Sequence, residues 1–189
     1  MRGFLFVISG PSAVGKTSVA KEIFERCSSL ERIITCTTRA PRAGESDGVD
    51  YFFMSREIFA ERALNGEFVE SSEVYGNSYG VLFSSVQEKI NGGHNSVLVL
   101  NWEGFLKIKK VFPDAVCGFF IVPPSLEVLR ERIQNRNSDS PDDVARRLKT
   151  AQDDMSHQEK FDYCCENREI SSTADQILAI IAEKTSLTL

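Results

Sequence analysis

The chain is poor in the features that build disulfide scaffolds, zinc sites or membrane spans. Its five cysteines are odd in number and show no C-x-x-C spacing, which argues against a disulfide framework and against a zinc site. No apolar run approaches the ~20 residues of a spanning helix, and Met1–Arg2 leads into a short strand-like run instead of a secretory signal. We therefore expect a protein of the reducing cytoplasm with no membrane partner.

The chain also lacks an excess of positive charge. With 22 Lys and Arg against 27 Asp and Glu, its net charge of −5 argues against general binding to nucleic acid. The 42% hydrophobic and 26% charged residues are an ordinary globular composition, and 189 residues suffice for one domain with a substantial core. Any phosphate-bearing ligand must therefore be held by individually placed residues.

Strand-like and helix-like segments alternate along the chain. Continuous apolar runs at 4–9, 97–100 and 116–122 predict strands buried on both faces of a parallel sheet. Helical patterns are predicted between and after these strands, at 15–27, 84–91, 125 to about 136, 141–155 and from about 173 onward. The alternation predicts an α/β layer fold with a mostly parallel sheet.

Residues 35–83 differ from this pattern, because Thr, Arg, Pro, Gly and Tyr crowd around one short helix. Ser55 is suited to cap that helix and Asn65-Gly66 to end it. We interpret this stretch as a functional insertion between the first two long strands.

The segment Gly10–Thr17, GPSAVGKT, matches G-x-x-x-x-G-K-[ST] and lies between a predicted strand and a predicted helix. Such a loop surrounds nucleotide phosphates with backbone N–H groups, its lysine bridges the β- and γ-phosphates, and its Thr hydroxyl binds Mg²⁺. The predicted ATP-binding residues are Gly10, Pro11, Ser12, Ala13, Val14, Gly15, Lys16 and Thr17. The loop predicts a nucleotide but no reaction, since GTPases, ATPases and small-molecule kinases share it.

Two further basic groupings follow. Arg39 and Arg42 flank a stiffening proline ahead of Tyr51, and guanidinium forks grip phosphate oxygens in pairs. Arg132 and Arg136 are four residues apart on a predicted helix, a like-charge spacing that costs stability unless an anion lies between them. Solvated surface arginines are the alternative at both places. Three positive groupings indicate a donor site, an acceptor site and a lid, which is a phosphotransferase arrangement.

The chain resembles the guanylate kinase family over nearly its whole length. The stretches TTRAPRAGE at 37–45 and YGNSYG at 75–80 form a pair specific to that family among small P-loop kinases. The resemblance implies a P-loop NTPase three-layer fold with a core (1–34, 85–126, 155–189), a GMP-binding insert (35–84) and a lid (127–154). It also implies transfer of the ATP γ-phosphoryl, with Mg²⁺, to GMP and dGMP by a monomer or homodimer in purine nucleotide metabolism.

Family roles map by position onto this sequence. The GMP phosphate would contact Arg39, Arg42, Tyr51 and Tyr79. Guanine would be recognised by Glu70, with Thr35 donating to its O6 atom. Lys16, Arg132, Arg136 and Arg147 would stabilise the transferring phosphoryl, Asn167 would help to hold adenine, and Thr17 would bind the metal.

The sequence departs from the family pattern at four positions. Ala13 replaces a loop glycine, Val81 replaces a hydroxyl residue, and Val99 and Asn101 replace two aspartates at a strand end. We hypothesise that Asn101 supplies a neutral oxygen to the metal and that Glu103 supplies charge. These changes leave a weakly active kinase, a plain ATPase and a protein-binding scaffold module as alternatives, although the intact phosphate loop disfavours the last.

Overall fold

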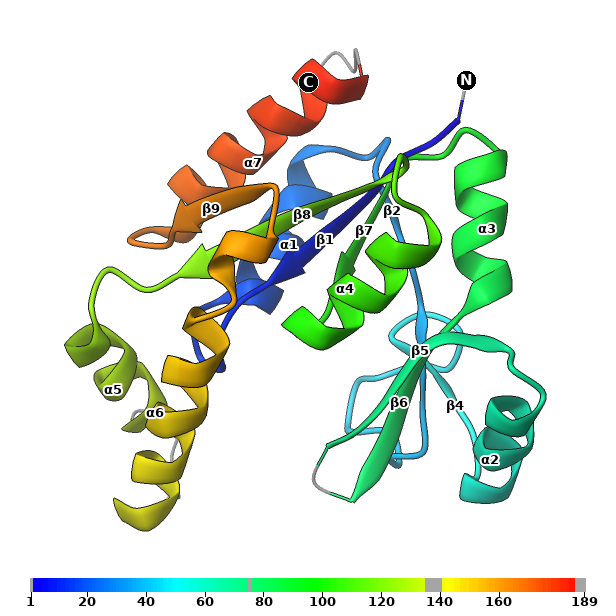
Figure 1. The fold of residues 1–189 in the computed structure, drawn as a ribbon, viewed down its shortest axis with the longest axis horizontal. Coiled ribbons are helices and arrows are strands. Elements are labelled where there is room, and N and C mark those ends of the chain that lie inside the picture. Colours follow the sequence, from blue (N-terminus) through cyan, green and yellow to red (C-terminus); the bar gives the residue numbers. More distant parts are fainter. Residues whose placement is uncertain (1, 75, 135–140, 186–189) are drawn as a thin grey trace.

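The computed structural model describes residues 2–74, 76–134 and 141–185. Its larger sheet is entirely parallel and confirms the predicted α/β class (Figure 1). The strand order is β2-β7-β1-β8-β9, which places the first strand of the chain at the centre. The strands are β1 (Leu5–Ser9), β2 (Glu31–Arg32), β7 (Ser96–Val99), β8 (Val116–Val122) and β9 (Tyr163–Glu166).

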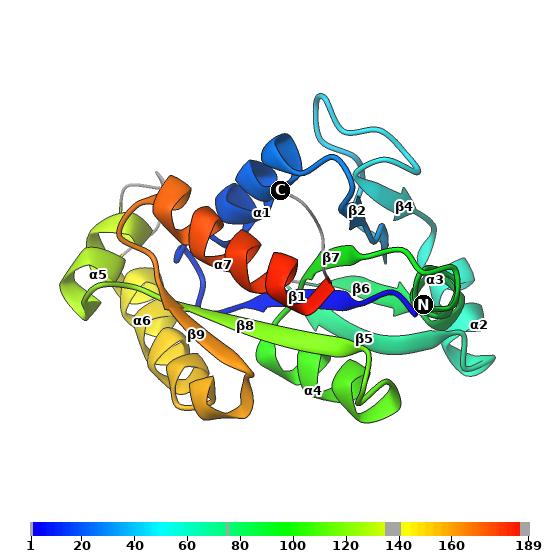
Figure 2. The same ribbon diagram turned by 90° about the horizontal axis from the view of Figure 1, so that it is seen from above.

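Helices cover both faces of this sheet, as Figure 2 shows, and so produce the expected three layers. Alternate residues of β1 point to opposite faces, because successive side chains of a strand do so. Phe6 and Ile8 join the apolar cluster beneath α1 (Lys16–Arg26) and α7 (Ile170–Thr185). Leu5 and Val7 join the cluster beneath α3 (Phe83–Asn91) and α4 (Trp102–Val111).

The inserted segment forms a second, mixed sheet of four strands in the order β4-β3-β6-β5. Its strands are β3 (Thr35–Thr37), β4 (Tyr51–Phe53), β5 (Phe68–Val74) and β6 (Asn77–Leu82), and α2 (Arg56–Leu64) packs on it. The predicted helix cap is confirmed, because Ser55 Oγ accepts from the Ile58 N–H at 3.3 Å. Gly66 follows the helix with φ 70°, a conformation that favours glycine.

The helices α5 (Leu126–Gln134) and α6 (Pro141–Met155) form an arm that projects from the core beside β8 and β9 (Figure 1). They share a small apolar cluster of their own, made of Leu129, Ile133, Val144 and Ala151. The predicted end of α5 near Arg136 lies outside the described residues. A short 3₁₀ turn, η1 (Gln158–Lys160), leads from the arm to β9.

The last helix begins at Ile170, three residues before the predicted start at Thr173. The apolar pattern begins later than the helix does, because the first turn is polar and only Thr173, Ala174 and the following inward residues are buried. Among the residues that the structure describes, no helix is both long and apolar enough to cross a membrane.

Candidate active site

The phosphate loop connects the carboxyl end of β1 to the amino end of α1. Gly15, the N-cap of α1, has φ 105°, and a Cβ there would lie 2.5 Å from Asn167 Nδ2. The Lys16 ammonium donates to the carbonyl oxygens of Gly10 and Pro11 at 2.7 and 2.8 Å. The sheet edge therefore carries a helix amino end and a lysine together, which is the composition of an anion site.

Ala13 occupies a left-handed turn, with φ 64°, and is the one non-glycine residue with positive φ in the described part of the chain. An alanine in this region costs about 1 kcal/mol relative to glycine. Its methyl group packs against the apolar cluster of the α5–α6 arm, which offsets part of that cost. Position 13, where the family pattern has glycine, thus adopts positive φ, and the alanine found there contacts the arm.

The carbonyl oxygen of Val14 joins three distant segments. It accepts from Asn167 Nδ2 at 2.7 Å and from Arg132 Nη1 at 3.3 Å. Arg132 Nη2 also donates to the Asn167 carbonyl at 3.1 Å, and Thr173 Oγ1 donates to Asn167 Oδ1 at 3.0 Å. Both ends of the Asn167 side chain are therefore bound to protein, and this residue, which is 2% exposed, braces the phosphate loop.

An open cavity of about 800 Å³ lies outside this brace, next to the amino end of α1. Gly15, Arg132 and Asn167 line it together with residues at the start of α7. Its wall thus includes part of the phosphate loop and one of the predicted lid arginines. This placement suits the nucleoside end of a donor nucleotide whose phosphates lie on the loop.

On the inserted sheet, Arg39 lies against the two predicted tyrosines. Its guanidinium carbon is 5.5 Å from the centre of the Tyr51 ring, and the Tyr51 and Tyr79 rings are 6.1 Å apart. Glu45 Oε1 accepts from Arg39 Nη2 at 2.8 Å, and Glu45 Oε2 accepts from the Arg42 N–H at 2.7 Å. The Glu45 hydrogen bond raises the pKa of Arg39, so the guanidinium stays charged. The sequence reasoning gave no role to Glu45.

Glu70 lies on β5 where the inserted sheet meets α4. It is 4% exposed, and its Oε1 atom has no hydrogen-bond partner among the described residues. Burial raises the pKa of this carboxyl group, whereas Lys107 and the Ser72 hydroxyl lower it and Glu103 raises it further. Val81 pairs with Glu70 in the strand register and packs in an apolar cluster of the core. A buried acceptor without a partner is what a ligand with N–H donors would satisfy.

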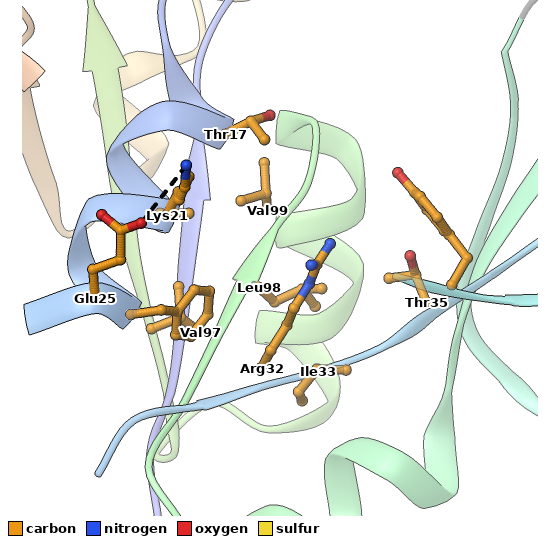
Figure 3. A pocket seen from close by; sticks show the side chains of 12 residues that line it. Thr17, Lys21, Glu25, Arg32, Ile33, Thr35, Val97, Leu98 and Val99 are labelled. Carbon is orange, nitrogen blue, oxygen red and sulfur yellow. Dashed lines mark ion pairs between the residues drawn. The ribbon is translucent and has the colours of Figure 1, made fainter. Parts of the chain in front are cut away.

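A cavity of about 450 Å³ lies between the larger sheet and the inserted sheet (Figure 3). Thr17 at the start of α1 lines one side, and Thr35 and Tyr51 line the other. Its floor is apolar and includes Val97, Leu98 and Val99 of β7. The predicted metal ligand of the donor site and two predicted acceptor residues therefore face the same space.

The end of β7 carries no carboxylate. Val99 lines the cavity, and Asn101 is the N-cap of α4, where its Oδ1 accepts from the Gly104 N–H at 2.9 Å. Its Nδ2 lies 3.4 Å from Glu103 Oε2. Asn101 is thus explained as a helix cap, which is the ordinary role of asparagine at this position, and its oxygen is already engaged.

Two of the three predicted lid arginines lie on the arm. Arg132 is on α5 and reaches the phosphate loop, as described above. Arg147 is on α6 and is half-buried. Arg136 lies outside the described residues. In the described part of the chain no three His, Cys, Asp or Glu side chains gather as a metal site.

Comparison with known proteins gives consistent matches. A family model described as guanylate kinase matches residues 2–184. The chain is 41% identical over 182 residues to guanylate kinase of Chlorobaculum tepidum, covering 96% of this chain and 93% of that protein. It is 38% identical over 178 residues to guanylate kinase of Thiobacillus denitrificans, covering 94% and 85%.

The fold matches as well. The crystal structure of guanylate kinase from Anaplasma phagocytophilum aligns with a TM-score of 0.79 and 35% identity, covering 99% of this chain and 88% of that one. The family match, the high coverage and the structural alignment agree with the motif pair at 37–45 and 75–80. The chain belongs to the guanylate kinase family.

Proposed function

We propose that this chain transfers the γ-phosphoryl group of ATP to GMP and releases ADP and GDP. The observation that carries the proposal is the 450 Å³ cavity, because Thr17 of the donor loop and Thr35 and Tyr51 of the acceptor sheet line it from opposite sides. Phosphoryl transfer between groups held in one space needs little covalent participation by the protein, so positioning and charge stabilisation supply most of the catalysis.

On the donor side, the phosphate loop binds ATP. Lys16 exchanges the carbonyls of Gly10 and Pro11 for the β- and γ-phosphate oxygens, which are stronger partners because they are charged. We assign to Arg132, which contacts the loop through the Val14 carbonyl, the role of neutralising charge on the transferring group. We assign the same role to Arg147 on the arm and to Arg136, which lies outside the described residues. Asn167 contributes by holding the loop.

On the acceptor side, Arg39, Arg42, Tyr51 and Tyr79 bind the GMP phosphate. An oxygen of that phosphate attacks the γ-phosphorus as the bond to the ADP oxygen breaks. Glu70 recognises the base, because guanine presents N1–H and N2–H₂ side by side and an ionised carboxylate accepts both. Adenine lacks this pair of donors.

The residues present fit a magnesium ion that arrives with the nucleotide. Thr17 offers one hydroxyl oxygen to the cavity, Val99 offers none, and Asn101 Oδ1 is engaged as a cap. Mg²⁺ commonly keeps several waters and is held largely by substrate phosphates, so this donor set is sufficient. When bound, the ion neutralises charge on the β- and γ-phosphates.

We retain the division into core (1–34, 85–126, 155–189), GMP-binding insert (35–84) and lid (127–154). The second sheet and the α5–α6 arm support it, since each has its own packing. The five cysteines are free thiols, which accords with the reducing cytoplasm that we propose as the compartment.

The test is an assay of ADP release with Mg·ATP and each of GMP, dGMP, AMP, CMP and UMP, with Lys16→Ala as the blank. We expect turnover confined to GMP and dGMP. ADP release that is independent of any acceptor would instead establish an ATPase. Tight GMP binding without turnover would show that the acceptor site works and that the lost strand-end acids abolish transfer.

A further inference from the structure

Glu70 is the most deeply buried carboxylate that the structure describes in the acceptor site, and it lies against the first two turns of α4. A Cβ at Gly104 would lie 3.1 Å from Glu70 Cγ and Cδ, which is a tight contact, so the glycine helps the helix to approach this closely. A carboxylate excluded from water loses most of its hydration. It stays ionised only if nearby charges or donors compensate for that loss.

The surroundings of Glu70 supply one positive group. Lys107 Nζ on α4 lies 3.9 Å from Glu70 Oε1, the oxygen without a hydrogen-bond partner. The remaining groups that act on this carboxylate are the Ser72 hydroxyl on its own strand and the carboxylate of Glu103 on α4, which is repulsive. The facing residue on β6 is Val81, which carries no charge.

Lys107 is anchored where it stands. Its ammonium donates to the carbonyl oxygen of Ser71 at 3.3 Å, so it is tied to the strand residue next to Glu70. Because its side chain is 53% exposed, the ammonium keeps part of its own hydration and the pairing costs little desolvation. The lysine therefore spans the junction between the core helix and the inserted sheet.

We propose that Lys107 is a positioning residue for base recognition, which keeps Glu70 ionised and oriented so that it accepts both guanine donors. The inference rests on the proposed role of Glu70 in reading the base. It adds that base recognition depends on a residue of the core helix α4, outside the inserted sheet that carries the other acceptor residues.

The physical consequence is a dependence of GMP affinity on pH. Protonated Glu70 presents a donor where guanine also presents donors, so GMP binding weakens as the pH falls through the Glu70 titration. Removing the Lys107 charge raises the pKa of Glu70 further, because burial and Glu103 then act with less opposition. The weakening then begins at a higher pH.

The experiment measures KM for GMP, KM for ATP and kcat between pH 5.5 and 8.5 for the wild type, Lys107→Met and Lys107→Arg. Lys110→Met, three residues along the exposed side of the same helix, is the matched control for loss of one charge. We expect Lys107→Met to raise KM for GMP about fivefold at pH 6 and to shift its pH profile upward. We expect KM for ATP to stay constant and Lys107→Arg to restore the profile.

Two results would overturn the proposal. One is a Lys107→Met profile that coincides with that of Lys110→Met. The other is an equal rise in KM for both substrates with a lowered melting temperature, which would mark a purely structural role. Glu70→Gln tests the role of Glu70 separately from that of Lys107. An unchanged preference for GMP over AMP in that variant would refute base recognition by Glu70, whatever Lys107 does.

Discussion

At the phosphate end of the acceptor site, one carboxylate organises two arginines. Glu45 binds the Arg39 guanidinium through one oxygen and the Arg42 backbone N–H through the other. Its pKa is lowered chiefly by the hydrogen bond from Arg39, so it is ionised whenever the site operates. An acid among the arginines that we propose to bind phosphate reduces the local positive charge, but it fixes the geometry of a loop that has no regular structure.

We predict that Glu45→Ala weakens GMP binding although it removes a negative charge. Without Glu45, Arg39 and the loop lose the hydrogen bonds that hold them in place. GMP must then order both when it binds, which lowers its affinity. KM for GMP should rise roughly tenfold while KM for ATP is unchanged, as measured by steady-state kinetics. Glu61→Ala on the exposed side of α2 is the control. A fall in KM for GMP would show instead that charge outweighs positioning.

A second prediction concerns the cost of burying Glu70. Its pKa is raised in the folded state by burial, so the folded protein binds the proton more tightly than the unfolded chain does. The free energy of unfolding therefore falls as the pH rises from the usual glutamate range through the raised pKa, and it stays lower above it.

Glu70→Gln removes that cost. The variant should be more stable than the wild type by about 1 kcal/mol at pH 8 and equal to it in acid, as urea titrations at both pH values will show. The same variant should lose preference for GMP over AMP. Equal stability at pH 8 would mean that the ionised carboxylate is already fully compensated.

These residues mark how far sequence reasoning extends. The phosphate loop was readable because its spacing and flanking elements are local. The sequence did not predict the proposed roles of Glu45 and Lys107 or the bracing of the loop by Asn167. Each depends on contacts that only the tertiary fold creates. The cap that Asn101 provides to α4 is of the same kind, since the helix it begins was not predicted from the sequence.

At the scale of elements, the base of the arm is joined to α4 by an aromatic contact. The rings of Trp102 and His157 stack with centres 3.6 Å apart, and Lys160 lies 4.9 Å from the Trp102 ring centre. The side chain of Trp102 also acts on Asp154, in the last turn of α6, and lowers the pKa of its carboxyl group. Burial raises the pKa of Asp154, while the charge of Lys16 opposes that rise. The arm is therefore tied to the same sheet edge as the phosphate loop.

We predict that Trp102→Leu loosens this joint. The last turn of α6 should exchange its amide hydrogens at least about tenfold faster, since the stacking on His157 and the contact with Lys160 are both lost. Turnover should fall several-fold with KM for GMP unchanged. Trp102→Phe, which keeps a stacking ring, should lie between. Unaltered exchange in α6 would show that Trp102 does not restrain the arm.

The elements themselves were predicted unevenly. Long apolar runs such as 116–122 gave β8 at its full extent, because a strand buried on both faces has an unbroken pattern. The strands of the inserted sheet were not separated, since β3 and β4 have only three residues each and carry binding residues in place of an apolar alternation. α7 starts before its apolar face does, which displaced its predicted beginning.

At the scale of the molecule, the inserted sheet and the arm lie on either side of the sheet edge that carries the phosphate loop (Figure 1). Each contains groups proposed to bind a nucleotide, and neither completes the site alone. Closure of both over the substrates would exclude water, which competes as a phosphoryl acceptor.

We predict that ATP and GMP together protect residues 35–82 and 141–155 from hydrogen exchange more than either nucleotide alone. The reason is that GMP engages the inserted sheet and ATP engages the arm, so both parts are restrained only when both nucleotides are bound. The measurement is exchange monitored by mass spectrometry with a non-hydrolysable ATP analogue. Identical protection by the analogue alone would contradict coupled closure.

The central position of β1 has a consequence for how the molecule is made. Its neighbours β7 and β8 follow about 90 and 110 residues later. The Val14 carbonyl next to β1 accepts hydrogen bonds from Arg132 and Asn167, which follow later still. During synthesis the first strand must therefore leave the ribosome with both edges unpaired and wait for most of the chain. The nucleotide loop, although it lies near the start of the chain, therefore depends on residues near its end for its hydrogen-bond partners.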